Sequence, residues 1–208
     1  MTGKRNYQRE MDEILHASET PAHVLLHACC APCSSACLER IADRAKITLF
    51  FYNPNILPEE EYRFRLAELH RLVQEMPLPG EPVTILEGKY DPERFLAFAK
   101  DMADLPERGE RCRLCIRMRL LEAALAAKAI GADYFATTLT LSPHKDAPYI
   151  NEAGFAIAAE TGIAYLPSDF KKQEGYKRSI ELSKQYNLYR QNFCGCPFSR
   201  RENEDAQS

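Results

Sequence analysis

Residues 23–35 read HVLLHACCAPCSS, and this stretch combines the two features that decide the fold. Its first six residues, HVLLHA, form an apolar run that is too short for a helix and predicts a buried strand. Ala31 and Pro32 then predict a turn, after which a helix can start at Ser34 or Ser35. Three cysteines lie between the end of the strand and the start of that helix. The stretch therefore predicts a buried strand that carries thiols at its carboxyl end.

The same order of strand and then helix repeats along the chain. Apolar spacing predicts further strands at residues 46–53, 82–88, 133–139 and 163–167. It predicts helices at residues 59–76, 92–103, 112–130, 151–161 and 176–187. Such an alternation is typical of an α/β fold with a mainly parallel sheet and helices on both faces. Because ligands bind these sheets at the carboxyl ends of the strands, we expect the first cysteines and the segment TTLTLSPHKD, residues 137–146, to face one crevice.

The composition predicts one soluble domain. With 208 residues, of which 45% are hydrophobic, the chain can bury a single sizeable core. We expect one α/β domain over residues 1–201, with a basic and aromatic segment at about 168–201 and a disordered tail at 202–208. The first residues contain no apolar signal-peptide core, and no later run approaches the roughly 18 apolar residues that span a bilayer. These features predict a cytoplasmic protein without a membrane partner.

Eight cysteines fall into three clusters along the chain. They are Cys29, Cys30, Cys33 and Cys37, then Cys112 and Cys115, and finally Cys194 and Cys196. Because the cytosol keeps ordinary thiols reduced, disulfide staples would be out of place there. Thiolate ligands of a metal or exchangeable redox thiols suit that compartment better. Long spacers separate the clusters, so folding alone can bring them together, and we expect a sulfur-rich pocket.

The spacing leaves the kind of sulfur site open. The pair Cys112 and Cys115 suits zinc, an iron–sulfur cluster or a redox disulfide, because this spacing brings both sulfurs to one side. With Cys30 and Cys33 it would make an all-cysteine zinc site. With Cys29 and Cys30 the adjacent ligands suit an iron–sulfur centre better than tetrahedral zinc.

Cys194 and Cys196 form a different kind of pair, because Gly195 alone separates them. Two sulfurs this close can form a strained and easily reduced disulfide, which suits a catalytic pair better than a staple. The alternatives are two further metal ligands or two inert thiols.

The carboxyl-terminal part of the chain is basic. Residues 165–201 contain eight Lys or Arg against three carboxylates, a net charge of +5, although the net charge of the whole chain is −3. Aromatic residues alternate with these bases, a mixture suited to phosphate contacts and base stacking. A solvated amphipathic helix with some core tyrosines would give the same pattern. The sequence has no glycine-rich phosphate loop, so ATP is not implied, and the isolated His27, His144 and Asp146 could serve in proton transfer or be ordinary polar side chains.

Several motifs, taken together, resemble one known family. They are HACCAPCSS at residues 27–35, FFYNPNI at 50–56 with EYRFR at 61–65, ERCRLC at 110–115, TTLTLSPHKD at 137–146, DFKKQEGYKRSIEL at 169–182 and LYRQNFCGC at 188–196. In this combination the chain resembles the epoxyqueuosine reductase family of the QueH type from about His23 to Pro197. The resemblance implies a cytosolic oxidoreductase that reduces epoxyqueuosine to queuosine at the wobble position of tRNA, using an external electron donor. It also implies a nucleotide-α-hydrolase-like, or Rossmann-like, α/β sandwich of the HUP class.

The resemblance further implies roles for single residues. The ligands of a [4Fe-4S] cluster would be Cys29, Cys30, Cys112 and Cys115. Cys194 and Cys196 would be the catalytic pair, either as a redox-active disulfide or, with Cys33, as ligands of an additional mononuclear iron. Cys37 has no role in the family pattern and is predicted to pack in the core. The predicted tRNA contacts are Arg113, Arg117, Lys171, Lys172 and Arg178.

Two other functions remain open at this point. One is a zinc-stabilised tRNA-binding protein without redox turnover, and the other is an iron–sulfur enzyme that thiolates tRNA. The missing glycine-rich ATP loop speaks against the thiolation enzyme.

Overall fold

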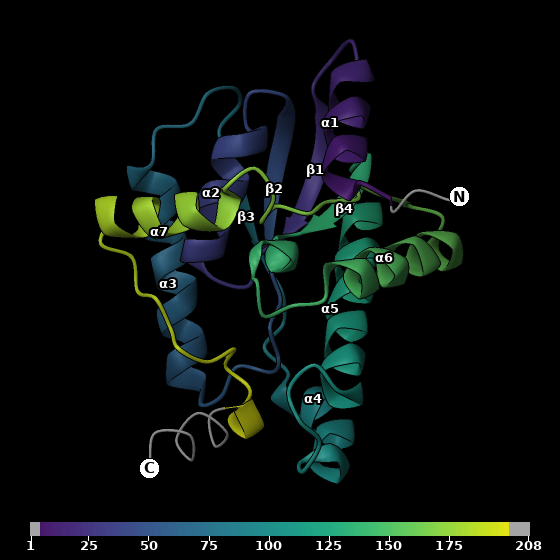
Figure 1. Cartoon of the computed structure of the whole chain (residues 1–208), viewed down its shortest axis with the longest axis vertical. Helices are drawn as coiled ribbons and strands as arrows, with labels where there is room; N and C mark the ends of the chain where they lie inside the picture. The colour runs from purple at the N-terminus through teal and green to yellow at the C-terminus, as the bar shows by residue number, and fades with distance from the viewer. Residues whose placement is uncertain (1–4, 200–208) are drawn as a thin grey trace.

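A five-stranded sheet forms the centre of the structure, a computed structural model that describes residues 5–199 (Figure 1). The strands are β1 (Ala22–His27), β2 (Ala45–Phe51), β3 (Thr84–Glu87), β4 (Tyr134–Thr137) and β5 (Ala164–Tyr165). All pair in parallel, in the order β3-β2-β1-β4-β5, so the predicted mainly parallel sheet is confirmed. Arg200, Arg201 and the predicted disordered tail at 202–208 lie outside the described residues.

Helices cover both faces of this sheet, as predicted. The helices are α1 (Tyr7–Ala17), α2 (Ala31–Ile41), α3 (Glu59–Glu75), α4 (Pro92–Ala99), α5 (Glu110–Ala129), α6 (Ala147–Thr161) and α7 (Gly175–Gln185), with short 3-10 turns η1 (Lys100–Met102) and η2 (Thr138–Leu141). Figure 1 shows α2, α3 and α7 on one side of the sheet and α5 and α6 on the other. Within residues 5–199, none of these helices combines the length and the apolar character that crossing a membrane would require. The arrangement is that of a Rossmann-like sandwich.

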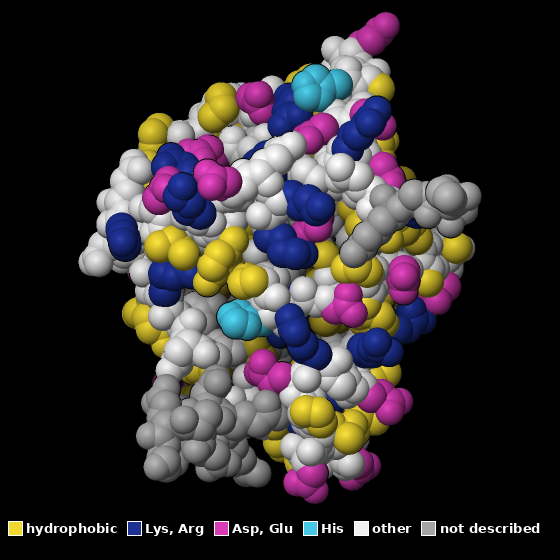
Figure 2. All heavy atoms as spheres, viewed as in Figure 1, with side chains coloured by type: hydrophobic (Ala, Val, Ile, Leu, Met, Phe, Trp, Pro, Cys, Tyr) yellow, Lys and Arg dark blue, Asp and Glu magenta, His cyan; other side chains and the backbone are white. Residues whose placement is uncertain are grey.

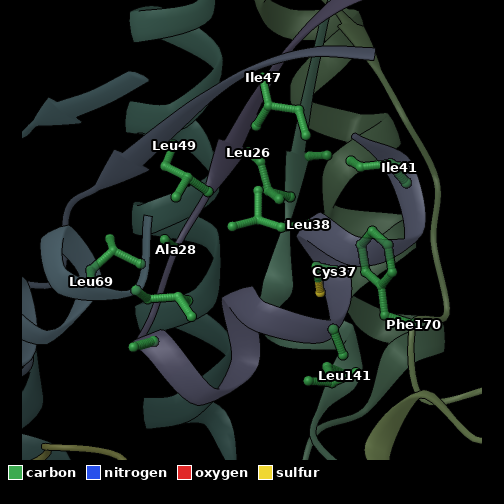
Figure 3. Close-up of a cluster of buried hydrophobic side chains, with 14 of the residues drawn as sticks. Leu26, Ala28, Cys37, Leu38, Ile41, Ile47, Leu49, Leu69, Leu141 and Phe170 are labelled. Carbon is green, nitrogen blue, oxygen red and sulfur yellow. The ribbon is translucent and has the colours of Figure 1, made fainter. Parts of the chain in front are cut away.

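Alternate residues of the strands build two separate cores. Val24 and Leu26 of β1 pack in the core beneath α2, α3 and α7, whereas Leu25 packs in the core beneath α5 and α6. A parallel strand covered on both faces is apolar throughout for this reason. Figure 3 shows the first of these cores, where Cys37 lies close to Leu38. Cys37 is fully buried there, which confirms the prediction that it packs in the core.

The order of the strands places a crevice between β1 and β4. After β1 the chain moves outward through β2 to β3, and it then returns to place β4 on the other side of β1. Connections therefore leave the neighbouring carboxyl ends of β1 and β4 in opposite directions, which opens a ligand site at this switch point. His27 and Thr137, paired in register, are the last residues of the two strands.

Two helix starts differ from the sequence prediction by three residues or more. The predicted turn at Ala31 and Pro32 is wrong, because α2 begins at Ala31 instead of Ser34 or Ser35. Proline is accommodated in a first helical turn, since its missing N–H has no acceptor to bond there. Helix α6 likewise begins four residues before position 151, where the Asp146 side chain accepts a hydrogen bond from the backbone N–H of Tyr149. The start of α6 is therefore set by a capping side chain ahead of the apolar pattern, whereas α2 starts after Cys30 without a side-chain cap.

Helix α1 was not predicted. The Asn6 side chain caps it by accepting from the backbone N–H of Arg9, and Met11 and Leu15, one turn apart, are buried in the core. These capping and spacing signals are present in the sequence and could have revealed the helix.

Candidate metal and redox centre

Three thiols meet where β1 ends and α2 begins. The Sγ atoms of Cys29, Cys30 and Cys33 lie within 4.8 Å of one another, with 3.7 Å between those of Cys29 and Cys30. Cys30 is buried and the other two are half-buried. Within the described part of the chain, no other group of three His, Cys, Asp or Glu brings its ligand atoms this close. Soft sulfur donors at this spacing suit zinc or an iron–sulfur cluster.

The start of α2 makes this position favourable for negatively charged sulfur. Cys30 is the residue that precedes the helix, and its backbone is extended, with φ −172° and ψ 163°. The first turn of a helix presents backbone N–H groups without helical acceptors and the positive end of the helix dipole. Both effects favour the thiolate form of nearby cysteines.

Cys29 carries the negative charge of this group. Hydrogen bonds from the thiols of Cys30 and Cys33 hold the pKa of Cys29 well below its usual range, and the hydroxyl of Thr138, 3.5 Å from Cys29 Sγ, adds to this effect. The same bond to Cys29 raises the pKa of Cys30 to about 12, and that of Cys33 lies well above normal. A metal that binds all three sulfurs must therefore displace two protons.

His27 ties the ends of three strands together beneath the thiols. Its Nε2 lies 3.1 Å from the carbonyl oxygen of Tyr52 and donates to it, so its Nδ1 accepts from the Thr137 hydroxyl at 3.0 Å. Complete burial, with the positive charge of Arg119 nearby, lowers the pKa of His27 to about 4. His27 is therefore a neutral structural residue at neutral pH.

The other four thiols, leaving Cys37 aside, gather around a second, smaller cavity. Cys112, Cys115, Cys194 and Cys196 line this cavity, which has a volume of about 20 Å³. Helix α5 begins at Glu110, two residues earlier than predicted, so the first two of these cysteines lie one turn apart near its start. All eight cysteines are free thiols in the structure, so the predicted disulfide between Cys194 and Cys196 is not formed here.

A strap at residues 186–196 brings the last two cysteines to this cavity. Figure 1 shows this segment running along α3 after α7 ends. Arg71 donates to the carbonyl oxygens of residues 186 and 187, and Arg65 donates to that of residue 193. Gly195 has φ +97°, and a Cβ there would lie 2.6 Å from Ile56 Cγ1. Glycine is therefore required between the two cysteines, both for backbone conformation and for space.

Cys194 and Lys145 shift each other's pKa at the second cavity. A hydrogen bond from the Cys196 thiol, followed by the positive charge of Lys145, holds the pKa of Cys194 well below its usual range. That bond raises the pKa of Cys196 above its normal value. Burial pushes the pKa of Lys145 downward, but the charges of Cys194, Cys112 and Cys115 together outweigh burial and the pKa ends above normal.

A larger cavity of about 380 Å³ joins the two thiol groups. Cys29, Cys30 and Cys33 line one part of it, and it shares Cys194, Arg119 and Lys145 with the smaller cavity. The other charged side chains along its wall are Arg65, Glu107 and Arg190, and His144 also lines it. Leu139 and Ser142 of the TTLTLSPHKD segment also line it, so the expectation that this segment and the first cysteines face one crevice is confirmed.

The four predicted cluster ligands lie in two neighbouring cavities. Cys29 and Cys30 line the larger one, and Cys112 and Cys115 line the smaller one. The structure adds Cys33 to the first pair as a close neighbour. Arg119, which follows Cys115 by one helical turn, and Lys145 line both cavities; sequence reasoning missed Lys145, although it lies within a motif that was singled out.

Most of the predicted tRNA contacts have protein partners. Arg113 lies over the ring of Tyr149, 5.0 Å from its centroid, and Arg117 pairs with Glu160 at 2.9 Å. Lys171 pairs with Asp169 at 2.6 Å, and Arg178 binds Glu39 and Glu181. The side chain of Lys172 has no ion pair among the described residues. Figure 2 shows the consequence, because Lys and Arg side chains over α7 are interleaved with carboxylates.

Comparisons with known proteins agree on one family. The family model described as "Epoxyqueuosine reductase QueH" matches residues 24–202. A protein of that name from Staphylococcus epidermidis is 41% identical, over 99% of this chain and 92% of its own. Its namesake from Staphylococcus aureus is 42% identical, over 94% and 84% of the two chains, and the one from Thermotoga maritima is 35% identical, over 89% and 94%.

Proposed function

Because the chain belongs to the epoxyqueuosine reductase QueH family, we propose that it is an oxidoreductase that converts epoxyqueuosine to queuosine at the wobble position of tRNA in the cytoplasm. One structural observation supports this function independently of the family name. Seven of the eight cysteines line two adjoining cavities at the switch point of the sheet. This amount of sulfur around a ligand site is suited to electron transfer and not to a packed core.

The donor atoms at this site fit an iron–sulfur cofactor. Three sulfurs lie within 4.8 Å of one another, Cys29 is held as a thiolate, and Arg119 and Lys145 supply positive charge beside the thiols. Positive charge of this kind offsets the negative charge of a thiolate-bound cluster. We assign Cys29, Cys30, Cys112 and Cys115 as the ligands of a [4Fe-4S] cluster, which would supply single electrons at low potential when bound.

The reaction requires two electrons and two protons. Both C–O bonds of the epoxide break, a carbon–carbon double bond forms, and the oxygen leaves as water. An external one-electron donor must therefore act twice, or a second redox group must store electrons.

Cys194 and Cys196 are assigned to this reaction in one of two forms. Only the dithiol form stores electrons, and in the other form the external donor would act twice. As a dithiol they would release two electrons and two protons on forming a disulfide, which balances the epoxide reduction. As thiolates they would instead bind, with Cys33, an additional mononuclear iron that acts as a Lewis acid. The position of Cys194 on the walls of both cavities supports either form.

Analysis of nucleosides tests this function directly. Protein purified without oxygen should contain about four or more irons per chain, and with a one-electron reductant it should convert epoxyqueuosine in tRNA to queuosine, as read by mass spectrometry. Colourless protein with one zinc and no product would instead identify the zinc-stabilised tRNA-binding protein. A gain of sulfur in the tRNA nucleosides would identify the thiolation enzyme.

The basic segment should supply part of the tRNA affinity. Joint replacement of Lys171, Lys172 and Arg178 by alanine is expected to reduce the slope of log K against log salt by about two to three, because each lost phosphate contact removes about 0.7 to 0.9. Filter binding between 50 and 200 mM salt would measure the slope. Lys46→Ala is the control, because Lys46 lies near the amino end of β2. An unchanged slope in the triple variant would remove these residues from the tRNA surface.

A further inference from the structure

Lys145 differs from the other cations along the larger cavity. Arg65 donates to Glu61, Arg119 donates to Asn53, and Arg190 donates to Ser183. The Nζ atom of Lys145 makes no hydrogen bond or ion pair with any residue of the range 5–199. Its three N–H donors are therefore available to a ligand.

Hydrogen bonds hold the backbone on both sides of Lys145. The backbone N–H of Lys145 donates to the carbonyl of Ser142 at 3.2 Å, and Asp146 caps α6 immediately afterwards. Arg108 donates to the carbonyl oxygens of Pro143 and His144, both at 2.9 Å. These contacts fix the position of the Lys145 backbone at the wall of the cavity.

The position of Lys145 between the thiols of the two cavities indicates which ligand it binds. It lines both cavities, with Cys194 shared between them. Electrons must enter the substrate beside these sulfurs, so the epoxide has to lie at the same junction. An ammonium group is charged at neutral pH, because the ordinary pKa of lysine is about 10.4.

We propose that Lys145 is a catalytic residue that donates a hydrogen bond from Nζ to the epoxide oxygen of the substrate. The inference rests on the proposed function and adds a group that touches the reacting atoms. When a C–O bond breaks, the bonding pair remains on the oxygen, and the ammonium group stabilises the alkoxide that forms. The two electrons come from a one-electron reductant acting twice, and two protons from solvent complete the water molecule. The charge develops only during the reaction, so the hydrogen bond strengthens toward the transition state.

Replacement of Lys145 by methionine tests this role. Methionine keeps the length and the apolar stem but has no charge or donor. We expect kcat to fall about 100-fold or more while KM changes less than about threefold, because an interaction made in the transition state affects kcat first. Lys145→Arg keeps the charge with a different shape and should recover about tenfold of the loss. Lys46→Met, which lies at the amino edge of the sheet, should match the wild type.

Iron content and visible absorbance per chain distinguish a catalytic role of Lys145 from a role in maintaining the sulfur site. Unchanged iron with the expected loss of kcat supports the inference. Retained kcat in Lys145→Met would overturn it, and so would a loss of iron in proportion to the loss of rate, because Lys145 would then serve the sulfur site. If the wild type itself formed no queuosine, the proposed function would fail instead, so the two failures are distinguishable.

Discussion

Cys29→Ser is expected to lower the rate of epoxyqueuosine reduction below about one thousandth of the wild-type rate and to remove most of the iron. Cys29 is the thiol with the strongly lowered pKa in the group of three, and Thr138 holds it in place. A serine hydroxyl stays protonated at neutral pH and is a hard donor, so it replaces a thiolate poorly as a ligand of iron. Iron analysis, visible absorbance and nucleoside mass spectrometry on anaerobic protein would measure the effect.

Cys37→Ala is the matched control for this experiment. Cys37 belongs to the same sequence cluster, but its side chain lies in the apolar core and lines neither cavity. We expect this variant to retain its iron and its rate, with a modest loss of stability from the deleted sulfur. Equal losses in both variants would show that the cluster of cysteines is structural and would contradict the assignment of Cys29.

Cys194→Ser should reduce turnover by about a thousandfold while the absorbance of the [4Fe-4S] cluster persists. Cys194 is not among the assigned cluster ligands, but it lies on the walls of both cavities and its thiol is poised as a thiolate by Cys196 and Lys145. Loss of this sulfur removes the dithiol and also removes a ligand of a mononuclear iron. Turnover and absorbance measured on the same preparation would test the prediction.

The same variant distinguishes the two forms of the pair. If the pair is a dithiol, wild-type protein that has been reduced and then freed of reductant should form about one product per chain, and the variant none, with equal iron in both. If the pair binds iron, the variant should lose about one iron per chain. Retained turnover in Cys194→Ser would reject both forms.

The sequence predicted the strands better than the starts of the helices. The run HVLLHA became β1 within one residue, because a strand buried on both faces must be apolar over its whole length. Helix α2 began three residues before its predicted start, because Pro32 suits a first turn as well as it suits a loop. Helix α1 was missed even though its cap and its two buried apolar residues are visible in the sequence.

The sequence predicted the cysteines of the candidate site but not the residues that surround them. Clusters of cysteines attract notice because unpaired thiols are few in most sequences, and the family resemblance gave them roles. Lys145 gave no such signal, since isolated cations are common and usually solvated. Arg178 was predicted to contact tRNA, and no sequence pattern indicated that Glu39 on another helix binds it.

The sequence by itself determined the alternation of strands and helices, the thiols after β1 and the membership of a reductase family, because each of these depends on residues close together in the chain or on their identities. Tertiary structure alone decided that Cys33 joins Cys29 and Cys30, that the strap along α3 brings Cys194 to the same cavity, and that Lys145 reaches it with no hydrogen bond from Nζ to the described residues. These facts depend on distances between residues that are far apart in sequence, and such distances are set by packing of the whole fold.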